Sequence, residues 1–582
     1  MNKYREQNFW LFTVDRLTIL SIVIFFIGAL IAIKLFYLQV LKHEKYADLA
    51  ERQHLVAREL MPERGEVFIH DYQLGENELY PAAGNKKFYL AYAMPSQVKN
   101  PRSSAKMLSP ILEMDEEVLY QRLAKADDIY EPLKHKLEET KKQEIESLEL
   151  PGIKFEEEVF RSYPEGEILA PITGFVGYQG NALVGQYGIE GYFEKILAGK
   201  KGFFVFERDA AGRLIPLAKR VKDEQENGAD IVLTLDRSIQ FTACNALEKT
   251  VLKHGADDGS VVIMDPATGA ILAMCSYPSF DPNNYQAAAD YKVYNNSAIF
   301  DPYEPGSMIK AITMAAALDV GALTPQTAYE DTGSVEIAGY TIKNSDGKAH
   351  GIKSMTEVLE ESLNTGAIFA ARAIGPELFR NYFERFGFGQ KTGIQLDSEK
   401  AGDITNLKYE KEIFMATASF GQGFTATPLQ IISAFSAIAN GGKLMKPYIV
   451  DEIKHPDGSV EKQAPQFLRQ IILAKTASTL SAMLGSVVKY GHAKRAQVPG
   501  YFIAGKTGTA QVANEETGKY YEDRSIHSFV GFAPIDKPRF VMLTKLTNPK
   551  GINFAESSAV PLFGEIAQFL LNYLRIPPSY TP

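Results

Sequence analysis

Three short strings, in one order along the chain, hold residues that can together perform serine acyl transfer: Ser307-Met-Ile-Lys310, Ser362-Leu-Asn364 and Lys506-Thr507-Gly508-Thr509. A nucleophilic serine needs a proton acceptor within hydrogen-bond reach, and its transition state needs donors aimed at the developing oxyanion. Ser307 and Lys310 are three residues apart, so on a helix they share one face, one turn apart. The pattern predicts a serine nucleophile whose base is a lysine.

The setting separates Ser307 from the other serines that precede a lysine at this spacing, which are Ser96, Ser103, Ser345, Ser459 and Ser486. Ser307 follows a Glu-Pro-Gly turn and opens a stretch to Val320 without internal Pro or Gly. Its hydroxyl is therefore expected at a helix N-terminus, where backbone N–H groups favour negative charge. Two of the other serines lie in turn signals, and nothing near the rest completes a site.

The same test selects Lys506 over Lys391, which also begins a Lys-Thr-Gly string. The stretch 501–512 predicts a strand with small residues where a substrate backbone must approach closely. Lys391 follows a Gly-rich loop and is expected in a surface turn. Ser362 falls within a predicted helical run, 355–374. Because all three strings occur in this order along the chain, we do not expect their combination to be a chance match.

Composition limits the other possibilities. The chain has 582 residues and a net charge of −9, which gives no support for a nucleic-acid partner. Cys244 and Cys275 suit no metal or redox spacing, and we expect them to be buried free thiols. No cofactor and no metal site is expected.

A membrane anchor is predicted near the N-terminus. The stretch 17–33 carries no charged residue, and with Lys34 snorkelling the apolar length extends to Leu41, long enough to span a bilayer. No small-residue cleavage site follows, so an uncleaved anchor is favoured over a signal peptide. The positive-inside rule does not decide the orientation, because basic residues flank both ends.

The remaining chain predicts two bodies of α+β type. We expect a short N-terminal tail over 1–16, an anchor over 17–41, a first body over 42–240, a catalytic domain that carries the three strings over 241–576 and a short tail over 577–582. The charged region 115–148 is expected to be helical, with a solvated face. In the catalytic domain we expect a hairpin over 260–276, helices over 307–320, 354–374, 376–386, 427–440 and 474–490, strands over 501–512, 526–532 and 539–547, and a last helix over 561–574. Strands at both ends of the domain suggest one antiparallel sheet packed against helices.

With these motifs in place, the chain resembles the class B high-molecular-weight penicillin-binding proteins over nearly its whole length. Supporting strings are Arg64-Gly-Glu-Val67, Arg161-Ser-Tyr-Pro164, Tyr187-Gly-Ile-Glu190, Leu233-Thr-Leu-Asp236, Tyr303-Glu-Pro-Gly306, Ser419-Phe-Gly-Gln-Gly423 and Thr427-Pro-Leu-Gln430. The resemblance implies a cytoplasmic tail over 1–16, an N-terminal anchor, an elongated pedestal or dimerisation-like domain over 42–240, and a peptidoglycan D,D-transpeptidase domain outside the cytoplasmic membrane. No glycosyltransferase signature of the class A relatives is found. A membrane-embedded glycan polymerase of the SEDS type, other wall-synthesis proteins, stem peptides and β-lactam antibiotics are the implied partners.

The resemblance also implies roles for individual residues. Ser307 would attack the penultimate D-Ala carbonyl of a stem peptide, and Lys310 would take the serine proton. Ser362 would relay the proton to the leaving amine, and Asn364 would orient Lys310 and the substrate. Lys506, Thr507 and Thr509 would hold the substrate carboxylate, and the Gly508 position keeps the strand open. The N–H groups of Ser307 and Thr509 would form the oxyanion hole.

Four other interpretations remain open. A D,D-carboxypeptidase differs only in using water as acceptor, and a β-lactamase would hydrolyse its acyl-enzyme quickly. A β-lactam sensor or a scaffold in a wall-synthesis complex would be non-enzymatic, although the intact Ser307, Lys310 and Lys506 argue against it. Within the family, Asn364 in the second string favours a division-type over an elongation-type enzyme.

Overall fold

The computed structural model describes residues 15–46, 55–72, 75, 78–125, 128–180, 182–208, 214–513 and 520–581. The chain forms two compact units, and each is described by itself. The first comprises residues 1–63 with 199–227, and the second comprises 64–198 with 228–582. Of the predicted N-terminal tail, only residues 15 and 16 lie within the described part.

The first unit contains the predicted apolar helix, α1 (Arg16–Phe36), which continues into a π-helical turn, Tyr37–Leu41. Over Arg16–Leu41 its mean hydropathy is 2.8, and none of its apolar window is buried in the protein. By length and composition this helix can cross a membrane. The unit also holds an antiparallel three-stranded sheet in the order β1-β8-β9, formed by Leu55–Leu60, Gly202–Arg208 and Leu214–Asp223.

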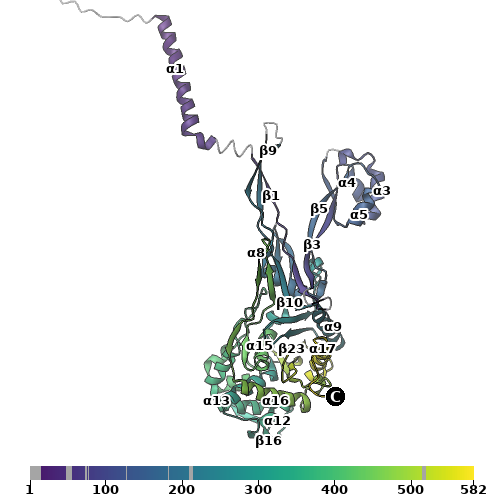
Figure 1. Ribbon diagram of the computed structural model, residues 1–582, viewed down its shortest axis with the longest axis vertical. Helices are drawn as coiled ribbons and strands as arrows, with labels where there is room; N and C mark the ends of the chain where they lie inside the picture. The colour runs from purple at the N-terminus through teal and green to yellow at the C-terminus, as the bar shows by residue number, and fades with distance from the viewer. Residues whose placement is uncertain are drawn as a thin grey trace, which may run out of the picture. The chain divides into compact units, whose positions relative to one another are not determined.

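The second unit is built around two larger sheets (Figure 1). The seven-stranded sheet joins segments far apart in the sequence, because β10 pairs with β2 on one side and β18 on the other. Its order is β19-β18-β10-β2-β3-β4, with β5 also paired to β3. The strands are β2 (Val67–His70), β3 (Leu79–Ala93), β4 (Glu131–Leu137), β5 (Ile153–Ser162), β10 (Asp230–Asp236), β18 (Val450–Lys454) and β19 (Val460–Lys462).

Parts of β3, β4 and β5 form a small lobe with its own apolar core, together with three helices. Its helices are α3 (Pro101–Leu112), α4 (Glu116–Leu123) and α5 (Glu139–Glu146). The prediction of a helical region over 115–148 was therefore wrong in its middle, where β4 forms. The charged residues of β4 form an outer strand that pairs with β3. This pairing with a strand distant in the sequence overrides the local helix propensity.

The five-stranded sheet of the catalytic domain has the order β12-β11-β23-β22-β21, and every pairing is antiparallel. Its strands are β11 (Asp258–Met264), β12 (Ile271–Tyr277), β21 (Ala504–Ala513), β22 (Tyr520–Ala533) and β23 (Phe540–Thr547). All but the last residue of β23 are buried, so helices cover both faces. This confirms the predicted α+β fold with an antiparallel sheet flanked by helices.

Most predicted helices of this domain are present. They are α11 (Ile309–Asp319), α15 (Pro428–Ala439), α16 (Ala474–Tyr490) and α17 (Ala559–Tyr573), together with α12 (Met355–Glu360) and α13 (Asn364–Arg385), which form where helices were expected over 354–374 and 376–386. Two further helices of the domain, α9 (Arg237–His254) and α14 (Glu412–Ser419), were not predicted. The exception among the predicted helices is the single helix expected over 354–374. It is broken between α12 and α13, because Ser362 adopts a left-handed conformation with φ of 56°.

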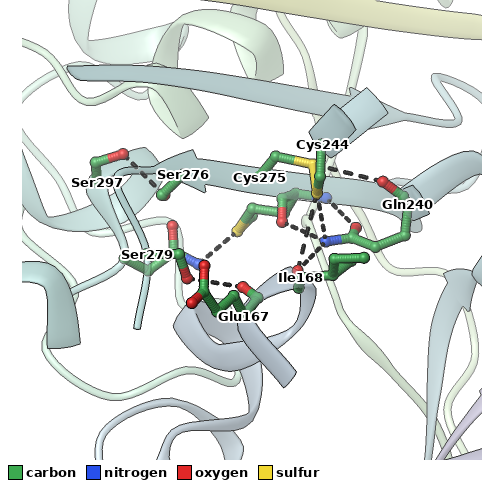
Figure 2. Close-up of a disulfide and its surroundings, with 10 residues drawn as sticks. Glu167, Ile168, Gln240, Cys244, Cys275, Ser276, Ser279 and Ser297 are labelled. Atoms are coloured by element: carbon green, nitrogen blue, oxygen red, sulfur yellow. Dashed lines mark hydrogen bonds between the residues drawn. A yellow bond between two sulfur atoms is a disulfide. The ribbon is translucent and has the colours of Figure 1, made fainter. Parts of the chain in front are cut away.

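The prediction of free thiols was wrong: Cys244 and Cys275 form a disulfide (Figure 2). Cys244 lies on α9 and Cys275 on the edge strand β12, with their Cα atoms 5.3 Å apart. The side chain of Gln240, one turn before Cys244, pairs with the backbone of Met274 through two hydrogen bonds of 2.9 Å. The tertiary packing of α9 on β12 thus brings together two cysteines whose spacing in the sequence carries no such signal.

Candidate active site

A cavity of about 1360 Å³ lies beside strand β21. It is lined by five of the residues that the sequence singles out: Ser307, Ser362, Asn364, Thr507 and Thr509. Lys310 and Lys506 are buried behind this lining. The three strings, far apart in the sequence, therefore meet at one place in the fold.

Ser307 lies in a 3-10 turn, Gly306–Met308, that leads directly into α11. Gly306 has φ of 58°, and its N–H donates to the carbonyl of Gly421 at 3.1 Å. A side chain at Gly421 would lie 2.0 Å from the Gly306 oxygen, so this contact requires glycine. The turn places the hydroxyl at the start of a buried helix, as the sequence predicted.

Ser362 is the point where the two lysines converge. Lys310 Nζ donates to the backbone oxygen of Ser362 at 2.5 Å and to its Oγ at 3.2 Å. Lys506 Nζ donates to the same Oγ at 3.0 Å. Within the described part of the chain, the hydrogen bonds of Lys310 run to Ser362 and not to Ser307.

Burial dominates the electrostatics of the two lysines. It holds the pKa of Lys310 well below its usual value, and the neighbouring positive charge of Lys506 lowers it further. Burial alone lowers the pKa of Lys506 to about 7. Lys310 is thus poised to be neutral and able to accept a proton.

Residues of strand β21 line the cavity, and the strand also carries Lys506, which contacts Ser362. Thr507 Oγ1 accepts a hydrogen bond of 3.3 Å from Lys506 Nζ, and Thr509 Oγ1 accepts one of 3.3 Å from the N–H of Ala555. Gly508 must lack a side chain, because a Cβ would lie 2.6 Å from Ser528 Oγ and 2.7 Å from the Pro305 oxygen. The strand can therefore approach the Ser307 turn closely.

Asn364 is the first residue of α13, and its side chain points elsewhere than expected. Its Nδ2 donates to the Lys343 oxygen at 2.8 Å, and no hydrogen bond to Lys310 is present among the described residues. Its backbone N–H donates to Asn344 Oδ1 at 2.9 Å. The side chain nevertheless lines the cavity, where a substrate can reach it.

Sequence reasoning missed two parts of this site. One is the segment between β23 and α17, residues 549–556, which lines the cavity. The other is a polar group beneath α13 formed by Asp331, Asn344 and Thr365. Asn344 opens an Asn-Ser-Asp-Gly turn that the sequence does signal, but that signal does not reveal what its side chain holds.

The geometry fits a serine acyltransferase site, and comparisons with known proteins identify the family to which the chain belongs. A family model described as the penicillin-binding protein transpeptidase domain matches residues 259–568, and one described as the penicillin-binding protein dimerisation domain matches residues 62–233. The chain belongs to the class B penicillin-binding proteins and carries their transpeptidase domain, as the sequence predicted.

Three relatives illustrate the match. Stage V sporulation protein D of Bacillus subtilis is 36% identical over 552 residues, which cover 94% of this chain and 83% of the relative. The probable peptidoglycan D,D-transpeptidase PbpC of Pseudomonas aeruginosa is 31% identical, with 96% of each chain covered. A crystal structure of penicillin-binding protein 3 from Mycobacterium tuberculosis, complexed with aztreonam, superimposes with a TM-score of 0.69 at 26% identity, covering 90% of this chain and 98% of that one.

Proposed function

We propose that this protein is a peptidoglycan D,D-transpeptidase that cross-links stem peptides through an acyl-enzyme on Ser307 and is inhibited by β-lactams. The observation that carries the proposal is the convergence of two buried lysines on Ser362, in the cavity that Ser307 lines. Burial lowers the pKa of both lysines, and the charge of Lys506 lowers that of Lys310 further, so the pair can supply one neutral base and one cation.

In the first half-reaction, Ser307 Oγ attacks the carbonyl carbon of the penultimate D-Ala while Lys310 accepts its proton. The N–H groups of Ser307 and Thr509 stabilise the oxyanion, and losing one such donor costs about 3–4 kcal/mol in barrier. The C–N bond to the terminal D-Ala then breaks, and its nitrogen receives a proton through Ser362 Oγ. The product is a serine ester with the terminal D-Ala released.

In the second half-reaction, the amine of another stem peptide attacks the ester carbonyl. The amine loses its proton to the lysine and serine pair, an amide forms, and Ser307 Oγ regains its hydrogen. Lys506, with Thr507 and Thr509 on the strand opened by Gly508, binds the terminal carboxylate of the donor peptide. A β-lactam carboxylate takes the same position. Asn364 contacts the substrate from the first turn of α13.

The proposal for the protein's location is supported by the apolar helix and the disulfide. We propose that residues 17–41 span the cytoplasmic membrane once and that the pedestal and the catalytic domain, residues 42–240 and 241–576, lie outside the cytoplasm. The helix Arg16–Leu41 is long and apolar enough to span, and a disulfide is typical of an oxidising compartment. A SEDS-type glycan polymerase and other wall-synthesis proteins are the partners expected in that membrane. A role in septal synthesis is preferred over one in elongation, on the strength of the Ser-Leu-Asn string.

The first test is intact-mass spectrometry after incubation with benzylpenicillin, with Ser307→Ala as the control. A stable adduct on the wild type alone supports the acyl-enzyme. An unmodified protein with intact drug would contradict the proposal, and an unmodified protein with consumed drug would indicate a β-lactamase. Incubation with a stem pentapeptide, with and without an acceptor amine, separates the remaining alternative: release of D-Ala without cross-linked product would indicate a carboxypeptidase.

A further inference from the structure

A group of buried polar side chains lies beneath the Ser362 turn, and the mechanism above does not use it. Its members are Asp331, on strand β13 (Ala328–Asp331), Asn344, which follows strand β15 (Tyr340–Lys343), and Thr365 in the first turn of α13. All three are at most 5% exposed. Buried polar groups are costly unless each is paired, so the pairing shows what the group stabilises.

Asn344 caps α13 from outside the helix. Its Oδ1 accepts from the N–H of Asn364 at 2.9 Å and from the N–H of Thr365 at 3.3 Å. The N-cap residue, Leu363, has no side chain that could do this. A distant residue therefore satisfies the first free N–H groups of the helix, which an N-cap side chain usually satisfies.

Asp331 in turn holds Asn344. Its carboxylate accepts from Asn344 Nδ2 at 2.9 and 3.1 Å and from Thr365 Oγ1 at 2.7 Å. It also accepts from the N–H groups of Gly333 and His350, each at 3.0 Å. These hydrogen bonds outweigh burial and lower the pKa of the carboxyl, so Asp331 is charged. A negative charge near the N-terminus of α13 also complements the helix dipole.

The position of Ser362 is coupled to the start of α13. This serine precedes α13 by two residues and holds φ of 56°, a conformation that non-glycine residues adopt only where the surroundings impose it. Its Oγ must stay within reach of Lys310 and Lys506, at 3.2 and 3.0 Å. A first turn free to shift would move both contacts at once.

We propose that Asp331 and Asn344 are positioning residues for acylation, which hold the first turn of α13 and so keep Ser362 Oγ between the two lysines. The inference rests on the proposed function. A misplacement of about 1 Å can reduce a rate about 100-fold. Loss of Asn344 should therefore slow the acylation step while leaving drug binding nearly unchanged.

The test compares Asn344→Ala, Asn344→Asp, Asp331→Asn and the swapped pair Asp331→Asn/Asn344→Asp, with Asn440→Ala as a matched control. Asn440 follows α15, and its side chain donates only to the Lys443 oxygen among the described residues. The acylation rate constant and the dissociation constant for benzylpenicillin are measured separately by stopped flow. Hydrogen exchange at the N–H groups of residues 364 and 365 reports the helix start without requiring any acylation.

We expect Asn344→Ala to acylate roughly 10- to 100-fold more slowly, with the dissociation constant changed less than about threefold and the two N–H groups exchanging faster. Asn344→Asp sets two carboxylates against each other, and the swapped pair restores one carboxylate facing one amide. The swapped pair should therefore acylate about tenfold faster than Asn344→Asp. The inference is overturned if Asn344→Ala keeps both its rate and its protected N–H groups, or if the swap gives no rescue. A wild type that does not acylate contradicts the proposed function instead, and the exchange data then still decide whether Asn344 holds the helix.

Discussion

At the scale of single residues, the candidate active site buries two lysines, and the fold bears the cost of desolvating them. Lys310 and Lys506 are both nearly inaccessible to solvent; burial lowers the pKa of each, and the charge of Lys506 lowers that of Lys310 further. Burying a charge without a counter-charge destabilises a protein. The residues that perform the chemistry are therefore expected to lower the stability of the fold.

Replacing Lys506 by Met should abolish acylation yet stabilise the protein by about 2–4 kcal/mol near pH 7. The pKa of Lys506 is about 7 when folded, against 10.5 as its usual value. The unfolded chain thus binds more protons between these values, so wild-type stability falls as pH falls from about 10.5 to about 7. Denaturant unfolding at several pH values checks this: the variant should lose this part of the pH dependence, and an unchanged slope would contradict the argument.

The charge of Lys506 should also control ligand binding. Because the lysine loses its proton as pH rises through about 7, it loses its attraction for a carboxylate. The dissociation constant for benzylpenicillin should increase by up to about tenfold per pH unit above that value. Stopped-flow binding between about pH 6 and about pH 9 measures this, and a flat profile would show that Lys506 stays charged throughout.

At the scale of elements, the sequence predicted what is local and missed what is long-range. Periodicity and turn signals within each segment predict the hairpin β11–β12, the helix α11 that follows Ser307, and the strand β21. The break at Ser362 does not, because the apolar pattern of 354–374 continues through it. It depends on Asn344, which satisfies the new helix start from elsewhere in the chain. The disulfide and the strand β4 were missed for the same reason.

The disulfide leads to a prediction about stability alone. The double variant Cys244→Ala/Cys275→Ala removes a cross-link over 31 residues, which constrains the unfolded chain. The expected loss is about 3–4 kcal/mol. The acylation rate should stay within about twofold, since the bond joins α9 to β12, at the sheet edge opposite β21. Chemical denaturation measures the first effect and penicillin acylation the second, and dithiothreitol treatment of the wild type provides the control.

A fully buried carboxylate lies beside the seven-stranded sheet, near β2 and β5. Glu190 lies between Arg64 and Arg161, at 2.5 and 2.7 Å. Glu190→Gln would remove the carboxylate that the two guanidinium groups share, leaving Arg64 its ion pair with Glu194 at 2.6 Å, and we expect a loss of about 3–5 kcal/mol in folding stability. Thermal unfolding measures this loss. Glu226→Gln, at an exposed ion pair with Lys200, is the control and should change stability by less than about 1 kcal/mol.

At the scale of the whole molecule, α1 and the second unit differ in the environment that suits their surfaces. Residues 17–41 are exposed and apolar, whereas the second unit buries its own apolar core. A chain that begins at residue 42 should therefore remain in solution without detergent and acylate at the full-length rate. Sedimentation and the stopped-flow assay check both points; aggregation of the shortened chain would mean that α1 covers apolar surface elsewhere in the protein.

The seven-stranded sheet has a consequence for biogenesis. Strand β10 needs β2, made early in synthesis, and β18, made after most of the catalytic domain. With the orientation proposed above, the sheet cannot be completed until residue 462, the end of β19, has emerged outside the cytoplasm. On that proposal the chain crosses the membrane before this sheet is complete. Until β18 arrives, the unpaired edge of β10 is open to binding by a chaperone outside the cytoplasm.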